Sequence, residues 1–244
     1  MRVYRVEDEI WQISLAWSNV WVLWEGGGSE ATLIDTGLQE DREGLQAGLR
    51  EIGIEEAQVR TVLLTHAHCD HGGNAAHFAR HSATVKLHED EAPFLRLPRR
   101  TYIPPGLALV MRPHTALAFA IGEARYPVER IGDGLVPLTT GQSIEAPGGP
   151  LRVVPCPGHT PGHAAFFRER DGVLFSGDAV MNIIPIRRVI GLSLPIRFLS
   201  SNWGEGKASA RSLADLAPRL LLSGHGPPLR EQTADRLQAW VQTL

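Results

Sequence analysis

The chain has 244 residues, 43% of them hydrophobic, and its 24 Lys and Arg against 27 Asp and Glu give a formal net charge of −3. This composition is typical of a soluble globular protein, and without a basic excess we expect no nucleic-acid partner. No uncharged apolar run reaches the ~18 residues of a membrane-spanning helix, and two cysteines with no signal-peptide core predict a cytoplasmic location away from membranes.

The first quarter of the chain is rich in β-branched and aromatic residues, which predicts strands. We expect them at residues 2–6, 10–16, 19–25 and 31–36, with a hairpin turn in the glycine-rich stretch 26–29. Apolar residues then recur at helical spacing, which predicts an amphipathic helix over 38–54.

Strands and helices alternate in the rest of the chain. A near-continuous apolar run at 59–65 predicts a buried strand, and a short helix at 74–81 and a strand at 83–88 follow. Later strands are expected near 151–155, 163–168, 172–176 and 219–223, with helices near 207–217 and 230–243. We interpret residues 1–244 as one α/β (α+β) domain of sheets sandwiched by helices, with irregular insertions at about 96–135 and 181–206.

Four potential metal ligands follow the strand predicted at 59–65, in the segment "THAHCDH". His66 and His68 are two residues apart at a strand end, so their side chains project to the same side and can reach one cation. Asp70 and His71 follow where the chain turns into a helix, and they can face a second point close by. Imidazole together with carboxylate suits zinc, iron or manganese.

Three more residues of ligand type stand at strand-to-loop junctions beside glycine: His159 in "PCPGHTPGH", Asp178 in "LFSGD" and His225 in "LLLSGHGPP". Glycine lets the backbone turn sharply and approach a site closely. Strand ends are where layered α/β architectures assemble their sites. We therefore expect these residues to join the histidine-rich segment.

The motifs "LIDTG", "THAHCDHGG", "PGHTPGH", "SGD" and "GHG" occur in this order between about residues 10 and 230. With these motifs in this order, the sequence resembles the metallo-β-lactamase-fold hydrolases, and within them the branch of glyoxalase II and the acyl-homoserine-lactone lactonases. The resemblance implies an αβ/βα four-layer sandwich, with two mixed β-sheets face to face and helices outside. It implies two divalent metal ions, zinc being expected and iron or manganese the alternatives.

The resemblance also implies a role for each ligand. His66, His68 and His159 would bind one metal, Asp70, His71 and His225 the second, and Asp178 would bridge the two. A hydroxide shared by the metals would attack the carbonyl carbon of an ester, thioester or lactone. Asp70 and Asp178 are thus the expected catalytic carboxylates.

Substrate residues are predicted from the irregular segments, which are apolar with a few arginines. A small, partly apolar substrate is expected, with Arg187 or Arg188 facing a carboxylate and Trp203, predicted to lie in a loop, as a pocket wall. The apolar segments could form either a lid or a homodimer surface.

Other polar residues leave two interpretations open. Asp35 could orient a ligand histidine or cap a turn. His163 is expected to be structural or to support the ligands. His77 and His81 lie one helical turn apart, and we expect surface or packing roles, with a metal pair as the alternative.

Two rival functions remain. Persulfide dioxygenases resemble glyoxalase II but hold a single iron, which here would sit on His66, His159 and Asp178. The chain could also be a non-catalytic metal-containing binding or sensor protein. In the lactonases a tyrosine follows the bridging aspartate shortly, whereas residues 179–181 here are Ala, Val and Met, which argues against that activity.

Overall fold

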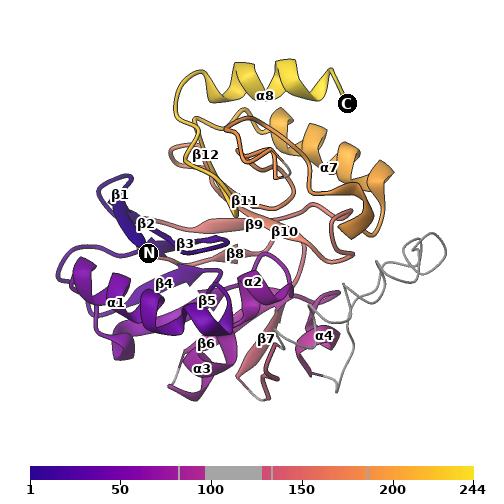
Figure 1. Ribbon diagram of the computed structural model, residues 1–244. Coiled ribbons are helices and arrows are strands. Elements are labelled where there is room, and N and C mark those ends of the chain that lie inside the picture. Colours follow the sequence, from indigo (N-terminus) through magenta and orange to yellow (C-terminus); the bar gives the residue numbers. More distant parts are fainter. Residues whose placement is uncertain (82, 97–127, 133, 186) are drawn as a thin grey trace.

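Two β-sheets face each other in the computed structural model, which describes residues 1–81, 83–96, 128–132, 134–185 and 187–244 (Figure 1). Helices cover the outer face of each sheet, so the layers follow the order helix, sheet, sheet, helix. The predicted αβ/βα sandwich is confirmed.

The first sheet contains the described strands between residues 2 and 138. Among the described residues its order is β1 (Arg2–Arg5), β2 (Ile10–Ser14), β3 (Asn19–Leu23), β4 (Ala31–Ile34), β5 (Val59–Leu63), β6 (Thr84–His88) and β7 (Leu135–Leu138). Pairs from β1 to β4 are antiparallel, and pairs from β4 to β7 are parallel. The change occurs because helix α1 (Arg42–Ile52) carries the chain back between β4 and β5.

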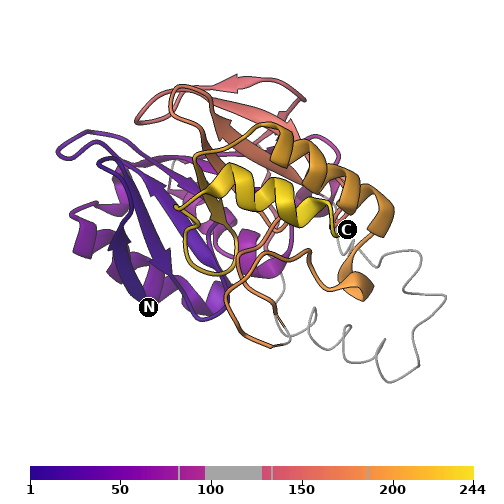
Figure 2. The ribbon, with the colours of Figure 1, turned by 90° about the horizontal axis from the view of Figure 1, so that it is seen from above.

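The second sheet has the order β12 (Leu220–Ser223), β11 (Val173–Gly177), β10 (Ala164–Arg168), β9 (Leu151–Pro155) and β8 (Ser143–Ile144). Its pairs are antiparallel except β11 with β12, which are parallel. Helix α7 (Trp203–Asp215) lies in the connection between these two strands, and helix α8 (Thr233–Val241) lies beside it over the same sheet (Figure 2).

Three apolar layers hold the sandwich together. Trp21, Phe166 and Phe175 are among the side chains fully buried between the sheets. Leu45 and Leu49 of α1 pack on the outer face of the first sheet, and Leu213 of α7 packs on the second. Burying one side chain of this size stabilises the folded state by about 1.5–3 kcal/mol. The packed core therefore holds the two sheets, and the loops that leave them, in fixed positions.

Short helices complete the fold: α2 (Cys69–Gly72), α3 (Ala75–Arg80), α4 (Ala92–Arg96), and the 3-10 turns η1 (Gln39–Asp41), η2 (Glu56–Gln58) and η3 (Arg197–Leu199). The predicted helix 38–54 is divided between η1 and α1. Strands β7 and β8 were not predicted. No helix of the described residues is long and apolar enough to cross a bilayer.

The two segments expected to be irregular have different outcomes. Most of 96–135 lies outside the described residues. In 181–206, isolated bridges join Met181 to Ser193 and Ile184 to Val189. The loop position predicted for Trp203 is wrong, because this residue is the first of α7. Asn202 caps that helix by accepting hydrogen bonds from Gly204 N and Glu205 N.

Candidate metal centre

Seven side chains of metal-ligand type meet at the edge where loops leave the two sheets. They come from the segment after β5, the β9–β10 loop and the ends of β11 and β12: His66, His68, Asp70, His71, His159, Asp178 and His225. Their ligand atoms form two groups of three, and a further set of His66, His71 and Asp178 overlaps both; within each of these sets all atoms lie within 4.8 Å of one another. The structure thus brings together all seven residues that the sequence singled out.

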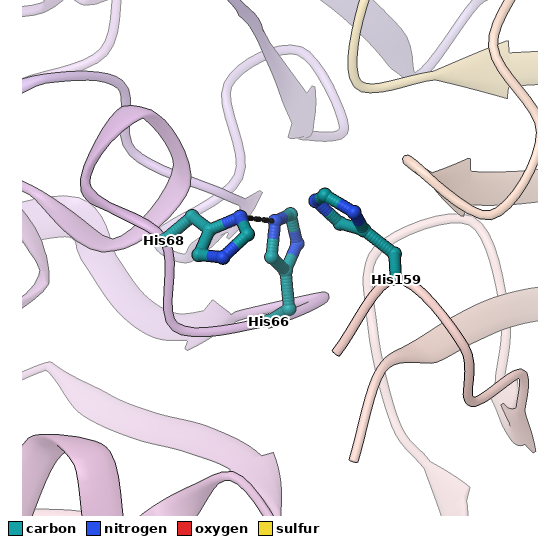
Figure 3. A group of neighbouring side chains, drawn as sticks. All are labelled: His66, His68 and His159. Atoms are coloured by element: carbon teal, nitrogen blue, oxygen red, sulfur yellow. Dashed lines mark hydrogen bonds between the residues drawn. The ribbon is translucent and has the colours of Figure 1, made fainter. Parts of the chain in front are cut away.

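The first group consists of the imidazoles of His66, His68 and His159 (Figure 3). His66 Nε2 lies 3.1 Å from His68 Nδ1, and the ring of His159 packs against both others at centroid distances of 4.9 and 4.6 Å. Burial lowers the pKa of His68, and it lowers those of His66 and His159 well below the ordinary value. The first group is therefore a cluster of neutral rings, the form that binds metals.

The second group consists of Asp70, His71 and His225. Asp70 Oδ2 lies 3.6 Å from His71 Nε2 and 3.5 Å from His225 Nε2, and the two imidazole nitrogens are 3.3 Å apart. Burial alone would lower both histidine pKa values, but the carboxylates of Asp178 and Asp70 outweigh it. The pKa of His71 is raised well above its ordinary value and that of His225 to about 9.

Asp178 lies between the two groups. Its Oδ1 is 3.4 Å from His71 Nε2, and its Oδ2 is 3.6 Å from His159 Nε2 and 3.2 Å from His225 Nε2. Burial would raise the pKa of this carboxyl, but His225 and His71 hold it well below its usual range. One buried carboxylate therefore faces imidazoles of both groups.

Three ligand rings are turned so that Nε2 faces the site. The Thr65 hydroxyl donates to Asp35, so its oxygen accepts from His66 Nδ1 at 3.0 Å. His71 Nδ1 donates to Asp35 Oδ2 at 2.8 Å, and His225 Nδ1 donates to the Trp17 carbonyl oxygen at 2.6 Å. Such contacts fix the tautomer and orientation of metal-binding histidines.

Asp35 serves the site from an unusual backbone conformation. Its φ is 62°, in the left-handed region that few residues other than glycine adopt. Its side chain is 1% exposed and also accepts from the Thr65 backbone N–H. Of the two roles left open for Asp35, its contact with His71 supports the orienting one.

His163 contacts the site through the backbone of Asp178. The Asp178 N–H donates to His163 Nε2 at 3.1 Å, so the ring proton is on Nδ1, which faces Cys156 Sγ at 3.1 Å. Burial lowers the pKa of His163 to about 3, so the ring stays a neutral acceptor that positions Asp178.

Two glycines leave room for side chains of the site, Gly224 for two ligands and Gly177 for two residues that support them. A Cβ on Gly224 would overlap Asp178 Oδ1 and lie 2.7 Å from His71 Cε1. A Cβ on Gly177, whose φ is +50°, would lie 2.7 Å from Thr65 Cβ. Any larger residue at either position would displace the site.

Glu91 is a buried residue that the sequence did not reveal. Its Oε2 accepts from the Ala67 N–H and its Oε1 from the Gly162 N–H, both at 3.0 Å. The side chain thereby joins the loop that carries His66 and His68 to the loop that carries His159. Nothing in the local sequence "HEDEAP" distinguishes this carboxylate from its acidic neighbours.

Asn19 was missed in the same way. Its side-chain N–H groups donate to the carbonyls of Ser223 and Gly226, and its backbone N–H donates to the Gly224 carbonyl. These bonds hold the loop of His225 against β3. A buried amide at the start of the apolar strand "NVWVL" was the available signal.

The predicted substrate residues lie on two sides of the site. Trp203 lines a small crevice with His159. Arg187 and Arg188 are exposed, and the Arg188 guanidinium lies 5.9 Å from the centre of the Trp17 ring. A groove of about 630 Å³ passes Trp17, Ile183, Ile190 and His225. Its walls expose apolar surface, since Trp17 is 60% and Ile190 70% exposed.

The donor set fits divalent metal ions of the zinc class. Imidazole and carboxylate are ligands that zinc, iron and manganese accept. Both ring nitrogens of His159 and Asp178 Oδ1 are buried with no hydrogen-bond partner in the described part of the chain. Buried polar atoms are seldom left unpaired, and a cation would satisfy these.

The family model of the metallo-beta-lactamase superfamily matches residues 18–225, a range that includes all seven ligand-type side chains. The chain belongs to the metallo-beta-lactamase superfamily. The resemblance seen in the motifs is confirmed, and the chain is related to metallo-hydrolases.

Individual relatives of this superfamily agree with the assignment. The chain is 28% identical over 210 residues to the probable metallo-hydrolase YflN of Bacillus subtilis (strain 168), covering 81% of this chain and 75% of the relative. It is 29% identical over 171 residues to the hydroxyacylglutathione hydrolase of Halorhodospira halophila (strain DSM 244 / SL1), covering 68% of this chain and 48% of that enzyme. A metallo-beta-lactamase family protein from Thermus thermophilus has a similar structure, with a TM-score of 0.74, 28% identity and coverage of 96% of this chain and 78% of that one.

Proposed function

We propose that this protein is a dinuclear metal-dependent hydrolase that cleaves an ester, thioester or lactone bond of a small, partly apolar substrate. One observation carries the proposal: the Asp178 carboxylate lies within 3.2–3.6 Å of imidazole nitrogens from both ligand groups. A carboxylate so placed can hold two cations side by side. His66, His68 and His159 would hold one metal, and Asp70, His71 and His225 the other.

The chemistry divides between the metals and the side chains. When bound, two divalent cations would lower the pKa of a water toward ~7 and polarise a substrate carbonyl. Asp70 is the more exposed carboxylate, at 27% against 8% for Asp178, so it can take the proton that the attacking water releases. Asp178 is enclosed by His71, His159 and His225 and would hold the two ligand groups at a fixed distance from each other. Hydrolysis then yields a carboxylic acid and the alcohol or thiol of the leaving group.

The substrate class is supported by the groove beside His225. Trp17, Ile183 and Ile190 provide apolar surface, which suits an acyl chain or ring rather than a sugar. Arg188 lies against Trp17 and could receive a carboxylate. The relative named hydroxyacylglutathione hydrolase acts, by its name, on an acyl derivative of glutathione, which favours acyl substrates here.

Metal analysis of protein purified without added metal tests the proposal first. We expect Asp178→Ala to lose both zinc ions of the candidate metal centre, and Asp235→Asn, a control at an exposed position of α8, to lose none. Loss of a single iron would instead indicate an oxygenase of the persulfide dioxygenase type. Equal metal content in Asp178→Ala and wild type would contradict the dinuclear assignment.

Activity on a panel of substrates tests the reaction. Nitrophenyl esters, acyl thioesters and lactones should be cleaved by the metal-loaded wild type and resist the Asp178→Ala variant. A loaded wild type that cleaves no member of the panel would favour a binding or sensor role.

A further inference from the structure

A second cluster of metal-ligand side chains lies on the outer side of the first sheet, at helix α3 (Figure 1). His77 is in α3, and His81 follows one helical turn later, so the two side chains share a face. Glu56, the first residue of η2, meets them from another segment. The ligand atoms of these three residues lie within 4.8 Å of one another.

The geometry of this cluster converges on a point. Glu56 Oε1 contacts His77 Nε2 and lies 3.8 Å from His81 Nδ1. The two imidazole rings are 4.4 Å apart between centroids. One carboxylate oxygen thus faces nitrogens of two rings, and two imidazoles with a glutamate are a ligand set that zinc accepts.

Neighbouring groups hold the three side chains, and one of these contacts would have to give way to a cation. His81 Nδ1 donates to the His77 carbonyl oxygen at 2.9 Å, so a metal bound at this nitrogen would replace that hydrogen bond and displace its proton. Gln46 Nε2 donates to the other oxygen of Glu56 at 2.7 Å. Ala76 and Phe78 are buried against the first sheet, which turns His77 outward. The side chains of His77, Glu56 and His81 are 12%, 25% and 54% exposed, so solvent reaches the cluster from the His81 side.

We propose that Glu56, His77 and His81 bind a transition-metal dication of the zinc, nickel or copper class, with water completing its coordination. This site is separate from the centre around Asp178 and does not depend on the proposed hydrolase function. η2 leads into β5 and then to His66, and α3 follows α2, which contains His71. The metal would therefore link the segment before His66 to the segment after His71. Its role would be to brace the fold behind the candidate metal centre.

Zinc binding to the full-length protein tests this site, with zinc chloride alone as the probe. Protein with a loaded active site is dialysed against about 10 µM free zinc, and bound metal is counted per chain. Wild type should hold one equivalent more than Glu56→Gln and one more than His81→Ala. Glu51→Gln, on the exposed face of α1, is the matched control and should bind as wild type. His81 is the most exposed ligand, so its replacement does not threaten folding.

Thermal unfolding provides the second measurement. Added zinc should raise the Tm of wild type and Glu51→Gln by several degrees more than that of Glu56→Gln or His81→Ala, because a ligand that binds only the folded state stabilises it. Equal metal content and equal Tm responses in all four proteins would mean that the cluster is a plain histidine–glutamate contact. Metal loss in Asp178→Ala with none in Glu56→Gln would overturn this inference while leaving the hydrolase proposal intact.

Discussion

The two ligand groups of the candidate metal centre differ in charge. His66, His68 and His159 are neutral rings packed together, with their pKa values lowered by burial. His71 and His225 lie against carboxylates that raise their pKa values above the ordinary range. Without metal, both ring nitrogens of His159 in the first group have no hydrogen-bond partner in the described part of the chain, whereas His71 and His225 in the second group pair with the carboxylates of Asp70 and Asp178. A metal therefore meets vacant lone pairs in one group and must displace protons in the other.

The largest effect is expected from Asp178, which belongs to both groups. Asp178→Ala should lower kcat/KM on the order of 10³-fold, since it removes a charge that positions the reacting centre. The measurement is steady-state hydrolysis of the best panel substrate, with far-UV circular dichroism to confirm folding. Wild-type turnover in the folded variant would show that the two groups do not act together.

Leucine substitutions of His225 and His159 should have different effects on the free energy of unfolding of the metal-free protein. His225→Leu removes the imidazole that lies 3.2 Å from Asp178 Oδ2 and leaves this carboxylate with the longer contacts to His71 and His159. It should lower the free energy of unfolding by about 2 kcal/mol. His159→Leu removes ring nitrogens that have no partner in the described part of the chain and should be close to neutral. Urea unfolding checks both variants, and equal destabilisation would contradict the charge difference.

Substituting the residues that support each ligand group should change the affinity for a different metal ion. Glu91 joins the loops of the first group, and Asp35 orients His71 in the second. Glu91→Gln should weaken binding of the first metal by about 10–100-fold and leave binding of the second nearly unchanged. Asp35→Asn should weaken binding of the second metal more than that of the first, because Asp35 contacts His71 directly and His66 only through Thr65. Competition with a chromophoric chelator measures both constants. If either variant reduced the affinity for both metal ions equally, the two supporting residues would not act on separate ligand groups.

The pH dependence should also differ. Raised folded-state pKa values stabilise metal-free protein below about pH 6.5, and this stability is lost as pH rises through about 9, the pKa of His225. The Tm of metal-free protein should therefore fall between pH 7 and pH 10. Affinity for the second metal should rise over the same range by up to about tenfold per pH unit for each displaced proton. A Tm that rises from pH 7 to 10 would reverse this assignment.

The smallest effect is expected at the groove, which opens beside the charged group at His225. Arg188→Ala should raise KM for an acidic substrate about threefold, the size of an exposed ion pair, without changing kcat. Arg187→Ala is the matched control, because Arg188 is the arginine placed against Trp17. An unchanged KM in both variants would place substrate recognition elsewhere.

The ligand set could be predicted from the sequence because every ligand follows a strand and most stand beside glycine. His66, Asp178 and His225 sit at the ends of β5, β11 and β12, and strand ends meet at one edge of the sandwich. Glycine at 177 and 224 marked places where backbone and ligands come close.

The supporting residues could not be predicted because their roles depend on tertiary contacts. Glu91 acts through backbone N–H groups of residues 24 and 71 positions away, which no local pattern encodes. The start of α7 was missed for a different reason. Asn202 followed by Glu205 is a helix-capping pattern, but both residues lie in the apolar, proline-containing segment 181–206, for which irregular structure is predicted.

Anomalous scattering at the zinc edge, from crystals grown with zinc, tests the central claim most directly. We predict one zinc peak on each side of Asp178, the first beside His66, His68 and His159 and the second beside Asp70, His71 and His225. A single peak, or two peaks that do not share Asp178, would contradict it.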